Sequence, residues 1–454
     1  MPSFLDREST VAPPGYNRFL VPPAALAVHL AIGQVYAFST FNLPLTKLIG
    51  ITHSAPGDWD LKTIGWTFSI AIAVLGVSAA LFGRWVERVG PRKSMFVSAL
   101  CFGLGFIVSA IGIHLHSLAL LYFGYGALGG CGLGIGYISP VSTLIKWFPD
   151  RPGMATGMAI MGFGGGALIG APLSVTLMKH FATPTSNGVL ETFVTMGVIY
   201  FLFMQIGVYA ARVPAPGWRP DGARARELEQ PRPLVTRANV TVEVAWRTPQ
   251  FWLLWGVLCM NVTAGIGVIG QASPMIQEIF NGRVSADAAT GFVGLLSLFN
   301  MGGRFIWASF SDYVGRRNTY FVFFGLGILL YFAVPHLGHL NSTIPFVLAV
   351  GIILSMYGGG FATIPAYLRD VFGTMHVGAI HGRLLTAWAV AGVLGLQLVN
   401  YIRAYQIEHG VPKAQAYTVT MYIMCGLLLV GLICNLAMRP VEERHHHREP
   451  VLSS

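Results

Sequence analysis

Charged side chains are scarce in this chain: Asp, Glu, Lys and Arg together make up 11 % of its 454 residues. A soluble globular domain carries about 25 %. Hydrophobic residues reach 54 %, and the mean hydropathy is +0.61. This deficit of charge argues against a soluble protein and predicts a polytopic membrane protein whose surroundings are the lipid bilayer.

Cysteine is also rare, and its five residues show no metal-binding spacing. All five fall within apolar runs, where we expect buried packing residues. Those runs contain no carboxylate, no nucleophile–base pair and no phosphate-binding loop ending in GK[ST]. We therefore expect neither an enzyme nor a bound cofactor or metal. The first twenty residues, with Asp6 and Glu8, do not resemble a cleavable signal peptide.

What the chain contains instead is apolar spans long enough to cross a hydrocarbon core of about 30 Å. We place twelve of them, at 19–43, 62–83, 93–114, 118–146, 154–180, 192–211, 250–275, 288–311, 319–337, 343–368, 378–402 and 416–438. The expected domains are an N-terminal tail (1–18), a six-helix half (19–211), a hydrophilic linker (212–247), a second six-helix half (248–438) and a C-terminal tail (439–454). The predicted fold class is an all-α polytopic membrane protein.

The formal net charge of +10 is explained by where the cations lie. With twelve spans, 22 of the 29 Lys and Arg fall on the side of the two tails and the linker. Six fall on the other side, and the last is Arg304. The positive-inside rule then predicts a multi-pass protein of the cell (inner) membrane with both termini cytoplasmic. The basic balance therefore does not indicate a nucleic-acid partner.

An internal repeat relates the two halves by a constant offset of 225 residues. The offset takes Glu87 to Asp312, Gly90 to Gly315, Arg92 to Arg317, Pro140 to Pro365, Gly153 to Gly378 and Gly157 to Gly382. Because six is an even number of spans, both halves enter the membrane in the same sense and form a parallel repeat. Such a repeat predicts a binding site between the halves and alternating access by rocking, with a single chain as the functional unit.

Two loops at matching positions carry an acidic residue followed by glycine and cations, GRWVERVGPRK (83–93) and ASFSDYVGRRN (308–318). Such loops can pair with neighbouring helix ends and hold one face of a transporter shut. Ordinary positive-inside charge is the alternative. The candidate gating residues are Gly83, Glu87, Arg88, Arg92, Asp312, Arg316 and Arg317.

Arg304 lies inside the apolar stretch 291–317, eight residues before Asp312, where the segment is expected to leave the membrane. At ~1.5 Å per residue, Arg304 is roughly 12 Å deeper. A cation at such depth costs from about 2.5 to more than 10 kcal/mol unless it faces protein or water. Asn300, one turn earlier, lies on the same helical face. We therefore expect an anion-binding site; the alternative is an arginine that snorkels or joins two helices.

Other polar and aromatic residues are predicted at membrane depth. Gln34 and Tyr36 lie in the first span, where each needs a partner. His29 is either a proton-coupling group, since histidine titrates near neutrality, or a simple donor to a backbone carbonyl. Tyr137 is deep enough to reach a central cavity. For Tyr357 and Trp388, which lie in later spans, packing and substrate contact both stay open.

Several motifs are family-specific. They are GQVYAFSTF, WFPDRPG, FNMGGRFIWASFSDYVGRR and YGGGFATIPAYLRDVFGT, followed by HGRLLTAWAVAG. Through them the chain resembles major facilitator superfamily transporters of the oxalate/formate antiporter type and is similar to bacterial monocarboxylate carriers. The resemblance implies that Arg304 binds a substrate carboxylate and that Asn300 positions it. It also implies that Tyr36, Tyr137 and Tyr357 line the cavity.

One departure from the resembled pattern bears on the substrate. Oxalate antiporters of this type have a lysine in helix 11, where this chain has Trp388. A dianion would then meet only Arg304, and its second charge would cost several kcal/mol in a low-dielectric cavity. Two milder departures lie in the loops: the first loop has Glu87 where the resembled pattern has aspartate, and the second has Ala308 where it has glycine.

We therefore expect a secondary active transporter of small monocarboxylates such as lactate, pyruvate or formate. It would work by proton symport or by anion exchange. Gln34 and Trp388 complete the predicted substrate-binding set. An oxalate:formate antiporter is the alternative.

Overall fold

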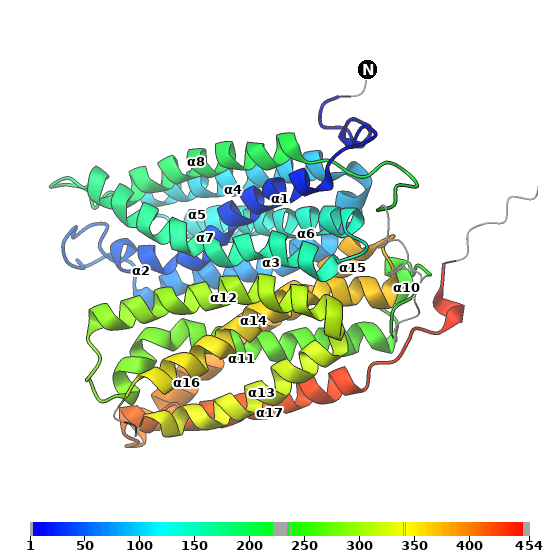
Figure 1. Cartoon of the computed structure of the whole chain (residues 1–454). Helices are drawn as coiled ribbons and strands as arrows, with labels where there is room; N and C mark the ends of the chain where they lie inside the picture. Colours follow the sequence, from blue (N-terminus) through cyan, green and yellow to red (C-terminus); the bar gives the residue numbers. More distant parts are fainter. Residues whose placement is uncertain (1–2, 221–233, 237, 339, 341, 448–454) are drawn as a thin grey trace, which may run out of the picture.

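The computed structural model describes residues 3–220, 234–236, 238–338, 340 and 342–447. Parts of the predicted linker (212–247) and C-terminal tail (439–454) lie outside these residues. Long helices run side by side in two stacked groups, with the first half above the second in Figure 1. The first half begins near the N-terminus and closes with α8, and the second begins with α11.

The helices of the first half follow the predicted spans, with interruptions in the first and fourth. They are α1 (Val21–Ile32), α2 (Ser39–Leu45), α3 (Leu61–Val89), α4 (Pro91–His114), α5 (Leu118–Leu121), α6 (Gly130–Trp147), α7 (Pro152–Phe181) and α8 (Val189–Ala210). A 3-10 segment, η3 (Gly33–Ala37), lies between α1 and α2, and a π-helical segment, η4 (Tyr122–Gly129), joins α5 to α6. Both interruptions fall in spans expected to line a central cavity.

The second half begins after a short helix, α10 (Val242–Ala245). Its helices are α11 (Pro249–Ile279), α12 (Ala286–Val314), α13 (Arg316–Leu337), α14 (Ile344–Phe372), α15 (Val377–Leu384), α16 (Thr386–Glu408) and α17 (Thr418–Leu436). The predicted span 378–402 is divided at Leu385 into α15 and α16. Helical hydrogen bonds continue through this point, because the N–H of Leu385 donates to the carbonyl of His381 and the N–H of Ala389 donates to that of Leu385.

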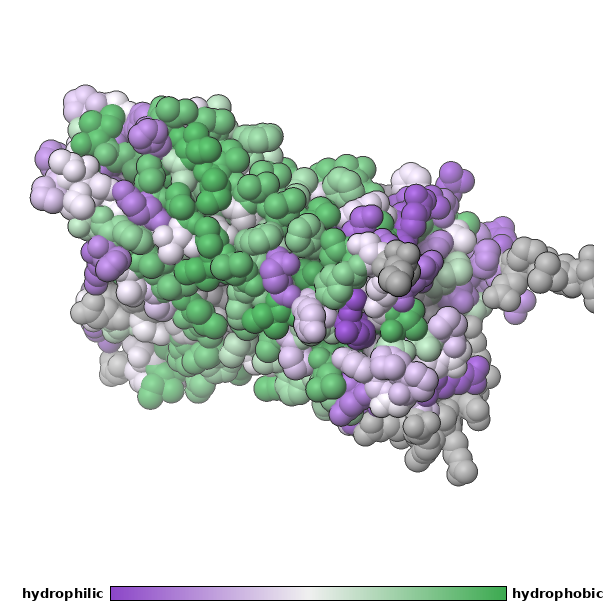
Figure 2. Space-filling view, turned by 90° about the horizontal axis from the view of Figure 1, so that it is seen from above, coloured by the Kyte–Doolittle hydropathy of each residue, from purple (hydrophilic) through white to green (hydrophobic). Residues whose placement is uncertain are grey.

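Within the described residues, eleven helical segments are long and apolar enough to cross a membrane. Twelve were predicted, and the one that falls short is α12, because Arg304 and Asn300 lower its hydropathy. It is nevertheless 29 residues long, like α3, and lies among the other long helices in Figure 1. An apolar surface covers the middle of the molecule in Figure 2, with hydrophilic residues toward both ends. The multi-pass prediction agrees with this surface.

The 225-residue offset holds for helix ends as well as for motifs. Helix α3 begins at Leu61 and α12 at Ala286, and the capping residues Asp60 and Ser285 each accept a bond from the backbone three residues on. Gly90 and Gly315 end these two helices with φ of +83° and +87°. A side chain is disfavoured in that conformation, which explains the glycine in both loops.

We call the end of the bundle that carries these two loops the motif face. Both described chain ends and both described parts of the linker lie there too (Figure 1). The linker is anchored at each side. Val213 exchanges backbone bonds of 2.9 Å with Thr10 and Ala12 of the first half, and the N–H of Thr236 donates to the carbonyl of Asp370, 2.7 Å away in the second.

Candidate functional site

Arg304 is fully buried on α12, at 0 % exposure. Its Nε donates to Oδ1 of Asn300 at 3.1 Å, as the i, i+4 spacing requires. Nη1 reaches the carbonyl of Ile160 on α7 at 3.5 Å. Among the residues that the structure describes, Nη2 has no hydrogen-bond partner. The guanidinium therefore lies at the boundary of the two halves with donor capacity unused.

Two glycines leave room for this side chain. A Cβ added to Gly164 on α7 would lie 2.8 Å from Nε of Arg304. A Cβ added to Gly358 on α14 would lie 2.5 Å from Oδ1 of Asn300. The rings of Phe163 and Phe361 flank the guanidinium carbon at 5.7 and 5.3 Å, within the range of cation–π attraction. The arginine is thus enclosed by helices of both halves.

Ion pairs in the described part of the chain do not include Arg304. Burying an uncompensated charge costs several kcal/mol. Aromatic faces and one amide oxygen offset only part of that penalty. The described residues therefore leave the charge of this buried guanidinium largely uncompensated.

Four of the predicted aromatic residues gather around Phe163 and Phe361. The hydroxyls of Tyr36 and Tyr357 lie 3.3 Å apart and join the two halves. The ring of Tyr137 is 5.3 Å from that of Phe163, and Trp388 is 4.6 Å from Phe361. Neither the Tyr137 hydroxyl nor the Trp388 indole N–H has a partner among the described residues.

Gln34 is not part of this cluster. Its amide nitrogen donates to Oγ of Ser174 at 3.4 Å, and its oxygen accepts from the Tyr200 hydroxyl at 3.0 Å. Both partners lie on helices of the first half, α7 and α8. Gln34 therefore has hydrogen-bond partners at membrane depth, as predicted, but both belong to its own half and neither is Arg304.

Two histidines adjoin the cluster, although only His29 was singled out from the sequence. Nδ1 of His29 lies 3.1 Å from the carbonyl of Ala25, the backbone bond that one of the two interpretations expected. Its ring is also 5.3 Å from that of Tyr137. His381 on α15 also contacts Tyr137, at 5.8 Å between ring centroids. The motif HGRLLTAWAVAG contained His381, but the contact depends on packing between halves.

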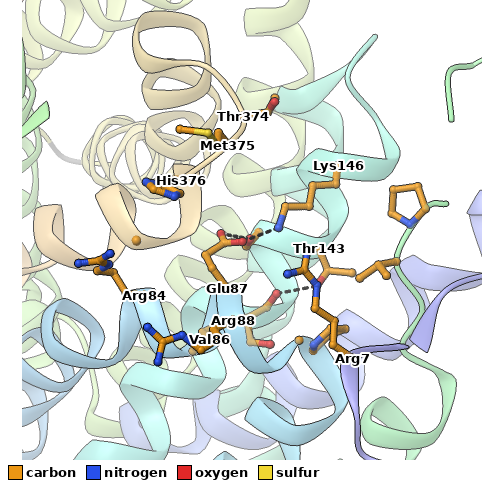
Figure 3. Close-up of a pocket in the computed structure, with 17 residues that line it drawn as sticks. Arg7, Arg84, Val86, Glu87, Arg88, Thr143, Lys146, Thr374, Met375 and His376 are labelled. Atoms are coloured by element: carbon orange, nitrogen blue, oxygen red, sulfur yellow. Dashed lines mark hydrogen bonds and ion pairs between the residues drawn. The ribbon is translucent and has the colours of Figure 1, made fainter. Parts of the chain in front are cut away.

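At the motif face, Glu87 of α3 joins the two halves (Figure 3). Oε1 accepts from the Ser142 hydroxyl at 2.6 Å and from the backbone N–H of Gly378 at 3.1 Å. Oε2 pairs with Lys146 at 2.5 Å. Gly378 lies in the first turn of α15, so a carboxylate of the first half caps a helix of the second.

Asp312 makes the equivalent contact in the opposite direction. Its two oxygens accept from the backbone N–H groups of Gly153 and Met154, at the start of α7, at 2.9 and 2.8 Å. Arg316 pairs with Asp312 at 2.5 Å and with Asp370 at 3.1 Å. Arg369 reaches back across the boundary to the carbonyl of Pro149 at 3.1 Å.

The remaining gating candidates have separate roles. Arg92 donates to the carbonyls of Phe4 and Ser9 and so holds the N-terminal segment. Arg317 donates to the carbonyl of Leu436 at 2.6 Å. Arg88 is exposed and lines a cavity of about 560 Å³ beside Glu87. Gly83 approaches α15, where an added Cβ would lie 2.8 Å from Cα of Ala379.

Comparison with known proteins agrees with this architecture. The chain is 24 % identical to the apicoplast pyruvate carrier 1 of Toxoplasma gondii, over 87 % of this chain and 78 % of the carrier. It is 25 % identical to the oxalate:formate antiporter of Oxalobacter formigenes, over 84 % of each chain. The proton:xylose symporter XylE superposes with a TM-score of 0.64 at 14 % identity, over 95 % of each chain.

The XylE superposition supports the fold alone, because sequence identity is low. The family itself follows from the sequence: the Major Facilitator Superfamily model matches residues 19–396. With two repeated halves of membrane-spanning helices, this protein is a membrane transporter that belongs to the Major Facilitator Superfamily.

Proposed function

We propose that this protein carries small monocarboxylate anions across the membrane by alternating access, with Arg304 binding the carboxylate. The single observation that carries the proposal is the buried guanidinium, whose Nη2 has no hydrogen-bond partner among the described residues. A carboxylate accepting from Nη2 would satisfy that donor and neutralise the charge at the same time. Relatives named for oxalate, formate and pyruvate support a carboxylate substrate.

The aromatic rings around the guanidinium favour a monoanion over a dianion. Trp388 is fully buried there, and its ring contacts Tyr137, Phe163 and Phe361. A monoanion would leave no net charge beside these rings, whereas a dianion would leave one. Lactate, pyruvate and formate fit this condition. An oxalate:formate exchange remains the second candidate, supported by the similarity to the Oxalobacter protein.

In the proposed cycle, Asn300 holds the guanidinium while the hydroxyls of Tyr36, Tyr137 and Tyr357 face the substrate. The bonds of Glu87 and Asp312 across the halves hold the motif face closed in this state. Because cations concentrate at the motif face, we assign it to the cytoplasm, with both termini inside. Opening toward the cytoplasm then requires release of these bonds and rocking of the halves.

The test is uptake of labelled lactate, formate and oxalate into proteoliposomes, with the parent protein and Arg304→Ala compared. We expect saturable lactate or formate uptake that the substitution reduces by about 100-fold or more, as for loss of a buried charged contact. Arg283→Ala, at the other end of the bundle, is the matched control and should transport normally. Unchanged uptake in folded Arg304→Ala would refute the proposal, and oxalate uptake equal to that of lactate would favour the second candidate.

A further inference from the structure

Two buried histidines, one from each half, contact Tyr137. His29, on α1, is 0 % exposed, and His381, on α15, is 1 % exposed. Their ring centroids lie 5.3 and 5.8 Å from that of Tyr137. Among the described residues, these are the two buried histidines. A row of three polar rings therefore crosses the boundary between the halves.

The polar atoms in this row lack partners. Within the described chain, Nε2 of His29, both ring nitrogens of His381 and the hydroxyl of Tyr137 make no hydrogen bond of good geometry, although the backbone of Tyr137 lies near His29 and the Arg304 side chain lies near the Tyr137 hydroxyl. Buried polar groups are otherwise paired in about nine cases of ten, so four unpaired atoms in one row need an explanation. Packing alone does not explain them, because apolar side chains would fill the same space without the desolvation penalty.

Carboxylates, the usual proton carriers in membrane proteins, do not lie at the centre of the described helices. In the α-helices whose side chains the structure describes, they occur in first or last turns, at Glu87, Glu191, Glu243, Glu278, Asp312, Asp370 and Glu408. Histidine is the remaining side chain that changes charge near neutral pH. The two buried rings are therefore the groups best placed to take up a proton beside the substrate.

We propose that His29 and His381, with Tyr137 between them, form the binding site for a co-transported proton, so that one proton moves with one monocarboxylate. The inference rests on the proposed function and decides between symport and exchange. The geometry that carries it is the row of unpaired polar rings adjoining the arginine site. The transported pair carries no net charge.

The positive charge of Arg304 would couple the proton to the substrate. Phe163 contacts both the guanidinium, at 5.7 Å, and Tyr137, at 5.3 Å, so the row begins one ring away from the arginine. A second cation there is unfavourable while Arg304 is unpaired, because like charges repel strongly in a low dielectric. A bound carboxylate removes that repulsion. By linkage, the proton must strengthen carboxylate binding by the same factor.

The surroundings of each ring place few other charges near the row. His29 packs against α7 at Gly162, and the charged group acting on it is Arg304 of α12. Beside His381, α6 presents Tyr137, and α3 presents Glu87 at the end of α15. Tyr357 of α14 and Tyr200 of α8 bond instead to Tyr36 and Gln34.

The position of His381 also suggests a route of release. It lies one turn after Gly378, whose N–H donates to Glu87 in the closed motif face. When that bond breaks and the start of α15 moves away, His381 becomes the first buried titratable ring reached from the motif face.

The test compares two assays in proteoliposomes. One is counterflow of labelled lactate at equal pH, which needs no net proton movement. The other is accumulation of lactate driven by an inward proton gradient. We expect His29→Gln combined with His381→Gln to reduce accumulation by about tenfold or more and to leave counterflow within about twofold. His336→Gln, at the exposed end of α13, is the matched control and should behave as the parent.

Lactate accumulation that persists in the double variant overturns the inference. Loss of both counterflow and accumulation in a folded double variant overturns it too. Absence of counterflow in the parent would instead refute the proposed function. If the double variant does not fold, the inference can be tested on the parent protein. Lactate added to the parent protein in weakly buffered detergent should withdraw protons from solution. Lactate binding by calorimetry without proton uptake would also overturn the inference.

Discussion

The carboxylate of Asp312, at the end of α12, accepts the backbone N–H of Gly153 at 2.9 Å across the boundary between the two halves. Glu87 and Gly378 form the equivalent contact at 3.1 Å, and each lies 225 residues from its counterpart. In this contact the carboxylate comes from the first half and the N–H from the second. Each half therefore caps a helix of the other. These two equivalent contacts, together with the bond from Arg369 to the carbonyl of Pro149, join the halves at the motif face.

Asp312→Ala should weaken this closure. It removes two backbone bonds to a charged acceptor and the pair with Arg316, and bonds to charged groups contribute about 1.5–3 kcal/mol each. We expect the population open at the motif face to rise by about tenfold or more. Spin labels at Arg88 and Thr374, on opposite halves, would report it as a longer distance in double electron–electron resonance.

Glu191→Gln, on α8 of the first half, is the control for the spin-label experiment. It removes a carboxylate charge without touching a contact between the halves. If Asp312→Ala and the control gave identical distance distributions, the contact of Asp312 with the start of α7 would not hold the motif face closed.

Asn300→Asp should block transport. The substitution places a carboxylate 3.1 Å from Nε of Arg304, where the amide oxygen now lies, and this internal carboxylate competes with the substrate. We expect uptake to fall by about 10- to 100-fold without loss of stability, because the buried charge becomes paired. Asn318→Asp, exposed on α13, tests for a general effect of added negative charge. Normal uptake by Asn300→Asp would show that Arg304 is not the carboxylate site.

Gly164→Ala should separate binding from folding. The added Cβ meets the flexible end of Arg304, 2.8 Å from Nε and 3.1 Å from Cδ, so the guanidinium has to shift. A displacement of about 1 Å at a binding group can reduce activity up to about 100-fold. We expect a higher KM for lactate with a thermal midpoint close to that of the parent.

Gly302→Ala is the matched control for Gly164→Ala, because its Cβ would meet nothing within 4 Å. Equal KM values for the two alanine variants would mean that the position of the guanidinium does not govern affinity.

Trp388→Lys should change the preference among anions. A lysine at this position adds a second cation to the wall formed by Tyr137, Phe163 and Phe361, and so compensates the second charge of a dianion. We expect oxalate binding to increase by about tenfold or more, measured by competition with labelled lactate. Trp388→Met keeps the wall apolar and should leave oxalate binding weak. If Trp388→Lys did not gain oxalate binding, the lack of a second cation would not explain a preference for monocarboxylates.

Helical spans and the repeat could be predicted from the sequence because each depends on local composition. Apolar length sets the spans, and the glycine at positions 90 and 315 follows from a backbone that disfavours side chains. The contact of Arg304 with Asn300 also follows from helical spacing. That these two residues bind substrate stays a prediction.

Contacts between distant helices could not be derived in the same way. The direction of Gln34, toward Ser174 and Tyr200 within its own half, depends on how α1, α7 and α8 pack. The pairing of His381 with Tyr137 depends on the register between the halves. The division of the predicted span at Leu385 has no proline to signal it. In each case a residue of ordinary type acquires its position from a partner far away in the chain.

The two anchors of the linker determine how far the halves can separate. Val213 is bound to the first half and Thr236 to the second, so about 22 residues connect the anchor points, with a fully extended reach of roughly 70 Å. Rocking of two packed bundles needs far less than this. The length of the connecting chain therefore does not limit rocking, and we expect the contacts of Glu87 and Asp312 to be the ones that hold the halves in the orientation seen here.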